Sequence, residues 1–186
     1  MQLKEIKDWS DERGLNDQTP DRNGFNAFIT EECGEALEAA IDGKIHGFVD
    51  ACADVVVFAV GDMYKRKMNV EKWLGSGSIV EWLGQAIYDP KFSYIEDIVY
   101  QQYLFLEAKT FEEEAQAMTN MTISSLKEIV NMGFDPDKVM DEVMKEISSR
   151  IGAYSEESKK WQKDKSPEAQ ALWYTADFSN CEFPEQ

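Results

Sequence analysis

The chain has 186 residues, of which 43% are hydrophobic and 12% aromatic. This length and composition predict one folded domain with a substantial core and exclude a disordered polypeptide. The formal net charge of −17 argues against general binding to nucleic acid or to an anionic membrane, because such surfaces are bound by basic patches. A nucleotide substrate remains compatible with this charge, since a bound cation and a few basic side chains reverse the field within a cleft.

The N-terminal part of the chain predicts three helices. Leu3, Ile6 and Trp9 recur at helical spacing in the first, and a polar loop follows it. The short turn Asp42-Gly43-Lys44 separates the second helix from the third, which suits an antiparallel helical hairpin. The predicted helices of this part cover residues 2–14, 25–41 and 45–67.

The second and third of these helices carry closely spaced carboxylates. The second contains Glu31, Glu32 and Glu35, and the third contains Asp50 and Asp54. Residues three or four apart lie on one face of a helix, so each helix has an acidic face. If the two faces are turned toward each other, at least four carboxylates meet in a mostly apolar bundle.

Two interpretations of these carboxylates compete. Charged residues at helical spacing usually form a solvated face, and one E-E-x-x-E motif alone favours that interpretation. The segment 48–60, however, is apolar all round except for its two aspartates, which predicts a buried helix. Buried carboxylates need a cation, and oxygen ligands without histidine or thiol favour Mg²⁺, with Mn²⁺ as the second candidate.

The E-E-x-x-E motif followed by a helix containing D-A-x-A-D-V resembles the all-α nucleoside triphosphate pyrophosphohydrolases. That superfamily includes MazG, the dimeric dUTP and dCTP pyrophosphatases and the phosphoribosyl-ATP pyrophosphohydrolases. The resemblance covers residues 1–68 and resumes at about 134–186, where the tail is similar to that of phage-type members. It implies an all-α, MazG-like helical bundle, Mg²⁺-dependent cleavage between the α and β phosphates, and assembly as a homodimer or homotetramer.

Carried across residue by residue, the resemblance implies Glu32, Glu35 and Asp54 as metal ligands. It implies Glu31 as a further ligand or a water-orienting base. The family motif has glutamate where this chain has Ala51, but Asp50, one residue earlier, resembles a variant of phage-type members. Asp50 is therefore a further candidate ligand, and a purely structural role is its alternative.

Residues 69–132 match nothing in this family and are interpreted as a helical insertion within a single domain spanning 1–186. The segment Gly75-Ser76-Gly77-Ser78 reads as a linker. The aromatic residues that follow it predict packed helices or a subunit interface, with a base-stacking lid as the alternative. The helices predicted in this block cover residues 79–88, 92–108, 110–118 and 122–132.

The last long helix is predicted at 136–153, with Asp135 as its N-cap and Pro136 at its first position. The tail after Pro167 is expected to form a short helix and then a loop. In relatives the closing helix supplies basic residues to the phosphates, and Lys145 and Arg150 are the matching residues here.

Two residues outside these motifs are candidates for contact with the nucleoside. Relatives use residues of the N-terminal helix to contact the base, which makes Trp9 a candidate, with a core or interface role as its alternative. Asn26, one and a half turns before Glu32, is placed to hydrogen-bond a base or ribose.

The cysteines and the apolar pattern bear on the cellular compartment. Cys33, Cys52 and Cys181 are odd in number and lack C-x-x-C spacing, which predicts buried, unpaired thiols in a reducing environment. The N-terminus lacks the apolar core of a signal peptide, and Asp54 interrupts the longest apolar stretch. We therefore expect a cytoplasmic protein without a membrane span, in the host cytoplasm if it is phage-encoded.

These features predict a Mg²⁺-dependent hydrolase that converts a nucleoside triphosphate to the monophosphate and pyrophosphate. A phosphoribosyl-ATP pyrophosphohydrolase is the alternative enzyme, because it shares the fold and the bond cleaved. From another class, the alternative is a catalytically silent helical interaction protein, whose acidic residues face solvent and whose aromatic block binds a partner.

Overall fold

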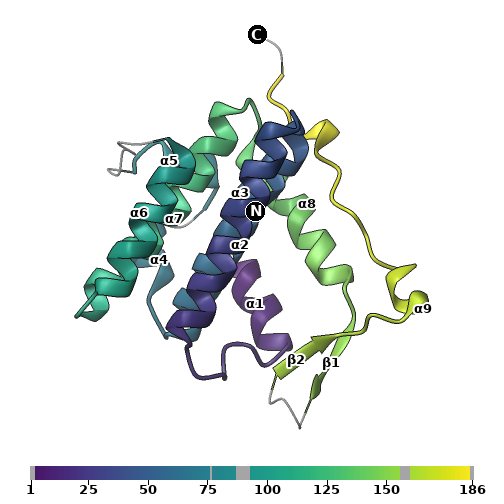
Figure 1. The fold of residues 1–186 in the computed structure, drawn as a ribbon, viewed down its shortest axis with the longest axis horizontal. Coiled ribbons are helices and arrows are strands. Elements are labelled where there is room, and N and C mark those ends of the chain that lie inside the picture. Colours follow the sequence, from purple (N-terminus) through teal and green to yellow (C-terminus); the bar gives the residue numbers. More distant parts are fainter. Residues whose placement is uncertain (1–2, 76, 87–92, 156–159, 185–186) are drawn as a thin grey trace.

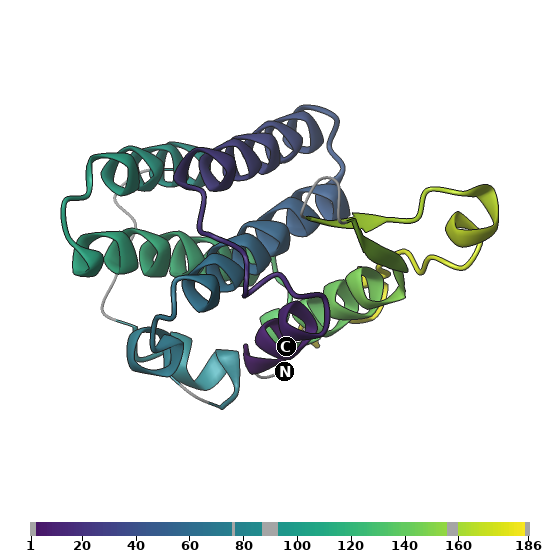
Figure 2. The same ribbon diagram turned by 90° about the horizontal axis from the view of Figure 1, so that it is seen from below.

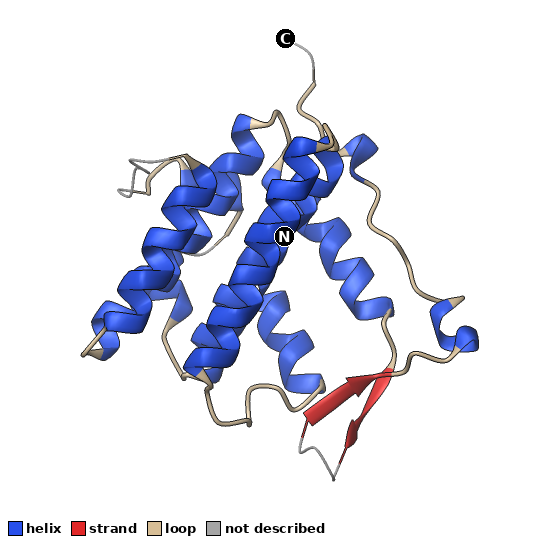
Figure 3. Cartoon of the chain, viewed as in Figure 1, coloured by secondary structure: helices blue, strands red, loops and turns tan. Residues whose placement is uncertain are grey.

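The structure, a computed structural model, describes residues 3–75, 77–86, 93–155 and 160–184. It is mostly helical, as predicted, with one small two-stranded sheet (Figures 1 and 3). The N-terminal helices are α1 (Lys4–Glu12), α2 (Arg22–Ile41), α3 (Ile45–Lys65), α4 (Val70–Leu74) and α5 (Ile79–Leu83). The later elements are α6 (Tyr94–Glu107), α7 (Phe111–Asn131), α8 (Pro136–Ser149), β1 (Gly152–Ser155), β2 (Lys160–Lys163), α9 (Pro167–Gln170) and the 3₁₀ turn η1 (Phe178–Asn180).

Two helical hairpins form the centre of the molecule. Helices α2 and α3 make the first, and α6 and α7 make the second. Helix α2 contacts α6, and α3 contacts α7, so each hairpin packs against the other through both of its helices (Figure 2). Helices α1 and α8 cover a further side of α3. The result is that α3 is surrounded by protein along most of its length.

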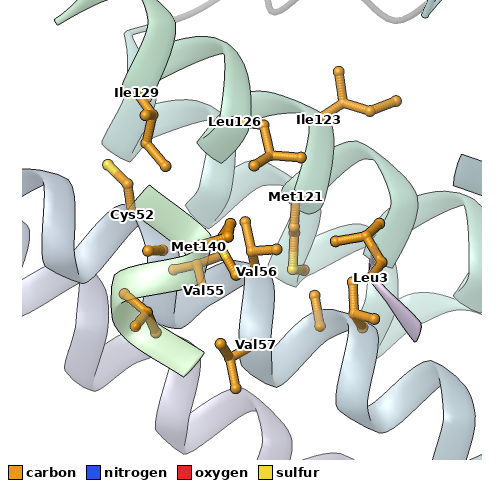
Figure 4. Packing of buried hydrophobic residues seen from close by; sticks show 14 of the residues in the cluster. Leu3, Cys52, Val55, Val56, Val57, Met121, Ile123, Leu126, Ile129 and Met140 are labelled. Carbon is orange, nitrogen blue, oxygen red and sulfur yellow. The ribbon is translucent and has the colours of Figure 1, made fainter. Parts of the chain in front are cut away.

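The burial of α3 follows from its composition. Its valines Val55, Val56 and Val60 have no exposed surface. Val55 and Val56 belong to the same buried cluster as Met121 and Leu126 of α7 (Figure 4). A helix that is apolar all round is stable only inside a core, because each buried branched side chain contributes about 1.5–3 kcal/mol of transfer free energy. Truncation of Leu126 to alanine would cost about 2–5 kcal/mol.

Two predicted helix boundaries, the turn between α2 and α3 and the start of α8, are confirmed. Gly43 connects α2 to α3 with φ +68°, a left-handed conformation that glycine adopts without steric penalty. At the start of α8, the Asp135 side chain accepts hydrogen bonds from the backbone N–H groups of Asp137 and Lys138, and Pro136 occupies the first helical position.

The prediction of two helices at 110–118 and 122–132 was wrong, because α7 is continuous from Phe111 to Asn131. Thr119 and Asn120 lie between the two predicted helices and Thr122 begins the second, and such residues compete for backbone hydrogen bonds. In the folded protein these three residues are buried and lie in the middle of α7. Asn120 Nδ2 donates to Gln101 Oε1 of α6 at 3.1 Å, and the Thr122 hydroxyl donates to a carbonyl of its own helix. Tertiary packing therefore outweighs the local preference.

The block 69–132 contributes to the main core rather than forming a separate layer. Trp82, Tyr94 and Phe105 are buried in the same hydrophobic cluster as the residues of α3, which agrees with the interpretation of packed helices. Residue 76 of the predicted linker lies outside the described residues. Residues 87–92, which cover the end of the predicted 79–88 helix and the start of the predicted 92–108 helix, also lie outside them.

The prediction that the last long helix continues to residue 153 was wrong. Helix α8 ends at Ser149, Arg150 takes an extended conformation, and β1 pairs antiparallel with β2. Gly152 makes this pairing sterically feasible, because a Cβ there would lie less than 3.0 Å from both the Gln162 carbonyl oxygen and the Trp161 ring. No helix in the described ranges is both long and apolar enough to cross a bilayer.

Candidate functional site

The α2–α3 hairpin brings the predicted carboxylates together in register. Counting outward from Gly43, Glu32 and Asp54 are equally distant from the turn, and Glu35 and Asp50 differ by a single position. The stacked rings of Phe28 and Phe58, also equidistant, confirm this register, since their centroids are 4.8 Å apart. The acidic faces of the two helices therefore meet, as the hypothesis of a shared site requires.

Glu32 is the most buried of the three glutamates. It is 6% exposed, whereas Glu31 and Glu35 are exposed to solvent. Burial, together with the charges of Asp54, Glu35, Glu31 and Asp50 in that order, raises the pKa of Glu32 to about 8. Its Oε2 atom is buried without a hydrogen-bond partner. A buried carboxylate oxygen of this kind costs about 1–3 kcal/mol or more unless a proton or cation satisfies it.

The two aspartates of α3 are partly buried and share this environment. The pKa of Asp54 is raised to about 7, first by burial and then by Asp50, while Arg150 acts in the opposite direction. The pKa of Asp50 is raised to about 6 by burial and by Glu146, and is again lowered by Arg150. Near neutral pH these side chains compete for protons, and a divalent cation would replace those protons.

Sequence reasoning missed Glu146, which faces the aspartates from α8. Its Oε1 accepts a charge-assisted hydrogen bond from Arg150, and its Oε2 accepts the backbone N–H of Ala176 at 2.7 Å. Both oxygens are therefore occupied, so Glu146 orients Arg150 and fixes the C-terminal segment against α8. The sequence signal that could have revealed this pair is the i, i+4 spacing of Glu146 and Arg150, which favours an ion pair on one helix face.

The two predicted phosphate-binding residues lie in different places. Arg150 extends toward Asp50 and Asp54, and its guanidinium also lies 5.9 Å from the centre of the Trp173 ring. Lys145 is exposed and pairs with Glu142, away from the aspartates. The structure thus brings Arg150 to the acidic residues and does not bring Lys145 to them.

A second basic residue near the site, Lys163, was not among the sequence candidates. It ends β2, opposite Gly152 of β1. Burial and the charge of Arg150 lower its pKa, while Asp54 and Glu146 act in the opposite direction. The sequence analysis could not identify Lys163, because residues 160–163 were not predicted to form a strand or to lie near α3.

Trp9 and Asn26 are not brought to the carboxylates. The indole N–H of Trp9 donates to the Ile147 carbonyl at 3.3 Å, so this side chain joins α1 to α8. Asn26 Oδ1 accepts a hydrogen bond of 3.0 Å from Gln102 of α6. At 100° per residue, Asn26 lies about 180° around α2 from Glu35. Their assignment to base binding remains a prediction, without support from this geometry.

The carboxylate cluster fits a divalent cation in chemistry but is not preassembled as a chelate. Among the described residues, no three histidine, cysteine, aspartate or glutamate side chains are grouped closely enough to hold a metal ion. Mutual repulsion separates carboxylates that have no cation between them, and the exposed side chains of Glu31 and Glu35 have room to rotate. The unpaired Glu32 oxygen and the oxygen-only donor set are the features that fit Mg²⁺.

The three cysteines are buried and free, as the sequence predicted. Burial raises the pKa of Cys33, next to Glu32, to about 11, so its thiol stays protonated and does not act as a metal ligand at neutral pH. Comparison of the chain with protein-family models, with curated proteins and with solved structures found no match.

Proposed function

We propose that the protein is a Mg²⁺-dependent nucleoside triphosphate pyrophosphohydrolase that produces a nucleoside monophosphate and pyrophosphate. The observation that carries the proposal is the pairing of acidic faces on α2 and α3, with the Glu32 oxygen buried and unpartnered between them. The motif resemblance supplies the reaction class. Five carboxylates on the facing sides of two helices would be costly without a cation.

Each side chain has a defined task in this proposal. Glu32, Glu35 and Asp54 would hold Mg²⁺, which neutralises charge on the triphosphate, and Asp50 would be a fourth ligand or support Asp54. Glu31, exposed at the edge of the cluster, would orient and deprotonate the attacking water. Arg150, held by Glu146, would bind the β and γ phosphates through its planar pair of N–H donors.

The assembly and location belong to the same proposal. We infer a homodimer or homotetramer in the cytoplasm, binding neither nucleic acid nor membrane. The apolar side chains of Val99, Tyr103 and Leu106 support an oligomer, because they lie on one face of α6 and are 37–59% exposed.

A pyrophosphate-release screen tests the activity. The purified protein would be incubated with Mg²⁺ and each canonical dNTP and NTP, dUTP and phosphoribosyl-ATP. Hydrolysis of a nucleoside triphosphate supports the proposal, and activity confined to phosphoribosyl-ATP would favour the alternative enzyme. Glu35→Gln should abolish turnover, whereas Glu38→Gln, on the same helix and also exposed, should retain it. The absence of both turnover and Mg²⁺ binding would point to a silent interaction protein.

A further inference from the structure

The C-terminal segment crosses one face of α8, beside which it runs in Figure 1. Its hydrogen bonds are accepted by α8 residues spaced four and then three positions apart, Glu142, Glu146 and Ser149. The backbone N–H of Tyr174 donates to Ser149 Oγ at 2.8 Å, and that of Ala176 donates to Glu146 Oε2 at 2.7 Å. The Tyr174 hydroxyl donates to Glu142. Side-chain acceptors, rather than a strand or a helix, thus fasten this part of the chain.

The fastened part differs in burial from the residues that follow it. No side chain of residues 173–177, here called the strap, is buried, and both hydrogen bonds of Tyr174 are exposed to solvent. Residues 178–181, here called the anchor, are instead held in the core, since Phe178 and Cys181 are each 3% exposed. A segment with exposed hydrogen bonds and little apolar burial opens at a lower free energy than one packed in the core.

Arg150 depends on the strap for its orientation. It follows the last residue of α8 in an extended conformation, so the helix itself does not fix its side chain. One oxygen of Glu146 accepts the Arg150 guanidinium, and the other accepts the backbone N–H of Ala176 in the strap. The ring of Trp173, also in the strap, has its centre 5.9 Å from the guanidinium. The strap therefore contacts Arg150 both directly and through a shared carboxylate.

The docked strap also carries an unsatisfied polar group. The indole Nε1 atom of Trp173 is buried without a hydrogen-bond partner among the described residues. A buried donor without an acceptor disfavours the docked state, because water satisfies it when the strap is released. This cost narrows the free-energy difference between the docked and released states.

We propose that the strap is a conformational switch. It leaves α8 as a unit while the anchor and the helical bundle stay folded, and Arg150 keeps its orientation only while the strap is docked. The link to ligand binding rests on the proposed function, in which Arg150 binds the β and γ phosphates. Such coupling is reciprocal, so a bound triphosphate holds the strap against α8 as strongly as the docked strap favours binding.

Amide hydrogen exchange of the full-length protein, resolved by NMR, tests the switch without a ligand. The anchor is represented by the N–H of Asp135, which donates to the Cys181 carbonyl at 2.8 Å. The N–H groups of Tyr174 and Ala176 should exchange at least about 10-fold faster than this group. Ser149→Ala should accelerate both strap amides together by about 5- to 10-fold, the loss of one hydrogen bond, and leave the anchor unchanged.

Two further serine variants control for folding defects. Ser148→Ala changes the neighbouring exposed serine and should alter none of these rates, whereas Ser149→Thr keeps the hydroxyl and should restore the wild-type rates. All three variants should melt within a few degrees of the wild type. Acceleration of Tyr174 alone would overturn a strap that moves as a unit. Strap amides that exchange no faster than the anchor, or an anchor accelerated with them, would overturn the switch.

Arg150→Gln tests the coupling from the other side. Loss of the guanidinium frees Glu146 to move, so the Ala176 N–H should exchange about 3- to 10-fold faster. Lys165→Gln, which changes an exposed lysine outside the strap, is the control and should leave this rate unchanged. Equal rates in the two variants would show that the strap and Arg150 are independent.

Calorimetry with Mg²⁺ and a non-hydrolysable dNTP tests the link to ligand binding. Ser149→Ala should weaken binding by about 3- to 10-fold, and the ligand should slow exchange of the strap amides in the wild type. Unchanged affinity in Ser149→Ala would overturn this link. Concerted strap exchange in a protein that binds no dNTP would refute the proposed function and retain the switch. Binding of dNTP by a protein whose strap exchanges like the anchor would refute the switch and retain the proposed function.

Discussion

At the scale of single residues, Glu32 has the environment most opposed to its charge. Burial and four neighbouring carboxylates raise its pKa to about 8, and one of its oxygens has no partner. Glu35 belongs to the same motif but is exposed, so neutralising it should change the stability of the metal-free protein little. Substitution of each glutamate in turn therefore separates a cost of folding at Glu32 from the proposed catalytic role of Glu35.

We predict that the metal-free protein loses stability as pH rises from about 4.5 to about 8. In that window the folded state retains a proton on Glu32 that the unfolded state releases, so the stabilisation is full below pH 4.5 and lost by pH 8. Asp54, with a pKa of about 7, acts in the same direction. Urea titrations at several pH values, with EDTA present, would measure it.

Glu32→Gln should flatten this pH dependence, because glutamine keeps the shape of the side chain and does not titrate. At pH 8 the metal-free variant should be more stable than the wild type. Glu38→Gln, on the exposed side of α2, is the control and should follow the wild-type curve. A variant as pH-dependent as the wild type would show that Glu32 is not the responsible group.

Asp50 departs from the motif that the chain resembles, and its substitution tests the proposal that it supports a metal ion. We predict that Asp50→Asn weakens Mg²⁺ by about 10- to 100-fold, the range typical of residues that support or complete a metal site. The Mg²⁺ dependence of the rate and the melting temperature would be measured together. A lowered melting temperature with an unchanged Mg²⁺ midpoint would exclude Asp50 as a ligand. It would favour the structural alternative, for which the expected loss of stability is about 1 kcal/mol.

At the scale of elements, the β1–β2 hairpin is peripheral to the core yet adjacent to the site. It follows α8 directly, and it lies outside the bundle in Figure 1. Its strands are only 4 residues long, so their pairing depends on outside contacts, such as that of the Trp161 ring with Arg13 at the end of α1, rather than on the sheet itself. Damage to this hairpin should therefore affect ligand binding more than global stability.

We predict that Gly152→Ala dislodges the hairpin, because the added methyl group would overlap the Trp161 ring and the Gln162 carbonyl. Proteolysis within 151–164 should accelerate, and affinity for a non-hydrolysable dNTP should fall, because Lys163 lies near Arg150 at the proposed site. The global melting temperature should change by only a few degrees. Gly61→Ala in α3 is the control: its methyl group has space 3.9 Å from Ile6 and should stabilise the helix by about 0.5–1 kcal/mol. Unchanged proteolysis and binding in Gly152→Ala would contradict this account.

At the scale of the whole molecule, the acidic cluster lies against the same core that holds all the long helices together. A cation that relieves charge repulsion at this cluster would therefore raise the free energy of unfolding of the whole protein. The formal charge of −17 adds a general repulsion that salt also screens, so a specific cation effect must be measured at constant ionic strength.

We predict that Mg²⁺ at about 100 times its dissociation constant stabilises the fold by about 2.7 kcal/mol, which raises the melting temperature by about 5–10 °C. NaCl of equal ionic strength should give a much smaller shift. Asp54→Asn should lose most of the specific shift. Equal melting temperatures in Mg²⁺ and in matched NaCl would argue against a metal site in this protein.

The sequence by itself determined the α2–α3 hairpin and its acidic faces. Those inferences rest on local rules: helical periodicity, a glycine in the turn, and a helix too apolar to face water except at its aspartates. The same rules placed Asp135 and Pro136 at the start of α8. Each of these features is encoded by residues close to one another in the sequence, which is why it could be predicted without the fold.

Only the tertiary structure decided which residues complete the site. Glu146 and Lys163 come near the aspartates because α8 packs against α3 and Trp161 of β2 lies against Arg13 at the end of α1, and no local pattern specifies those contacts. For the same reason Lys145 and Arg150, equally basic in sequence, have different surroundings. The continuity of α7 likewise depends on Gln101, a partner on another helix. Contacts between distant segments are set by the packing of whole elements, and that packing is a property of the complete fold.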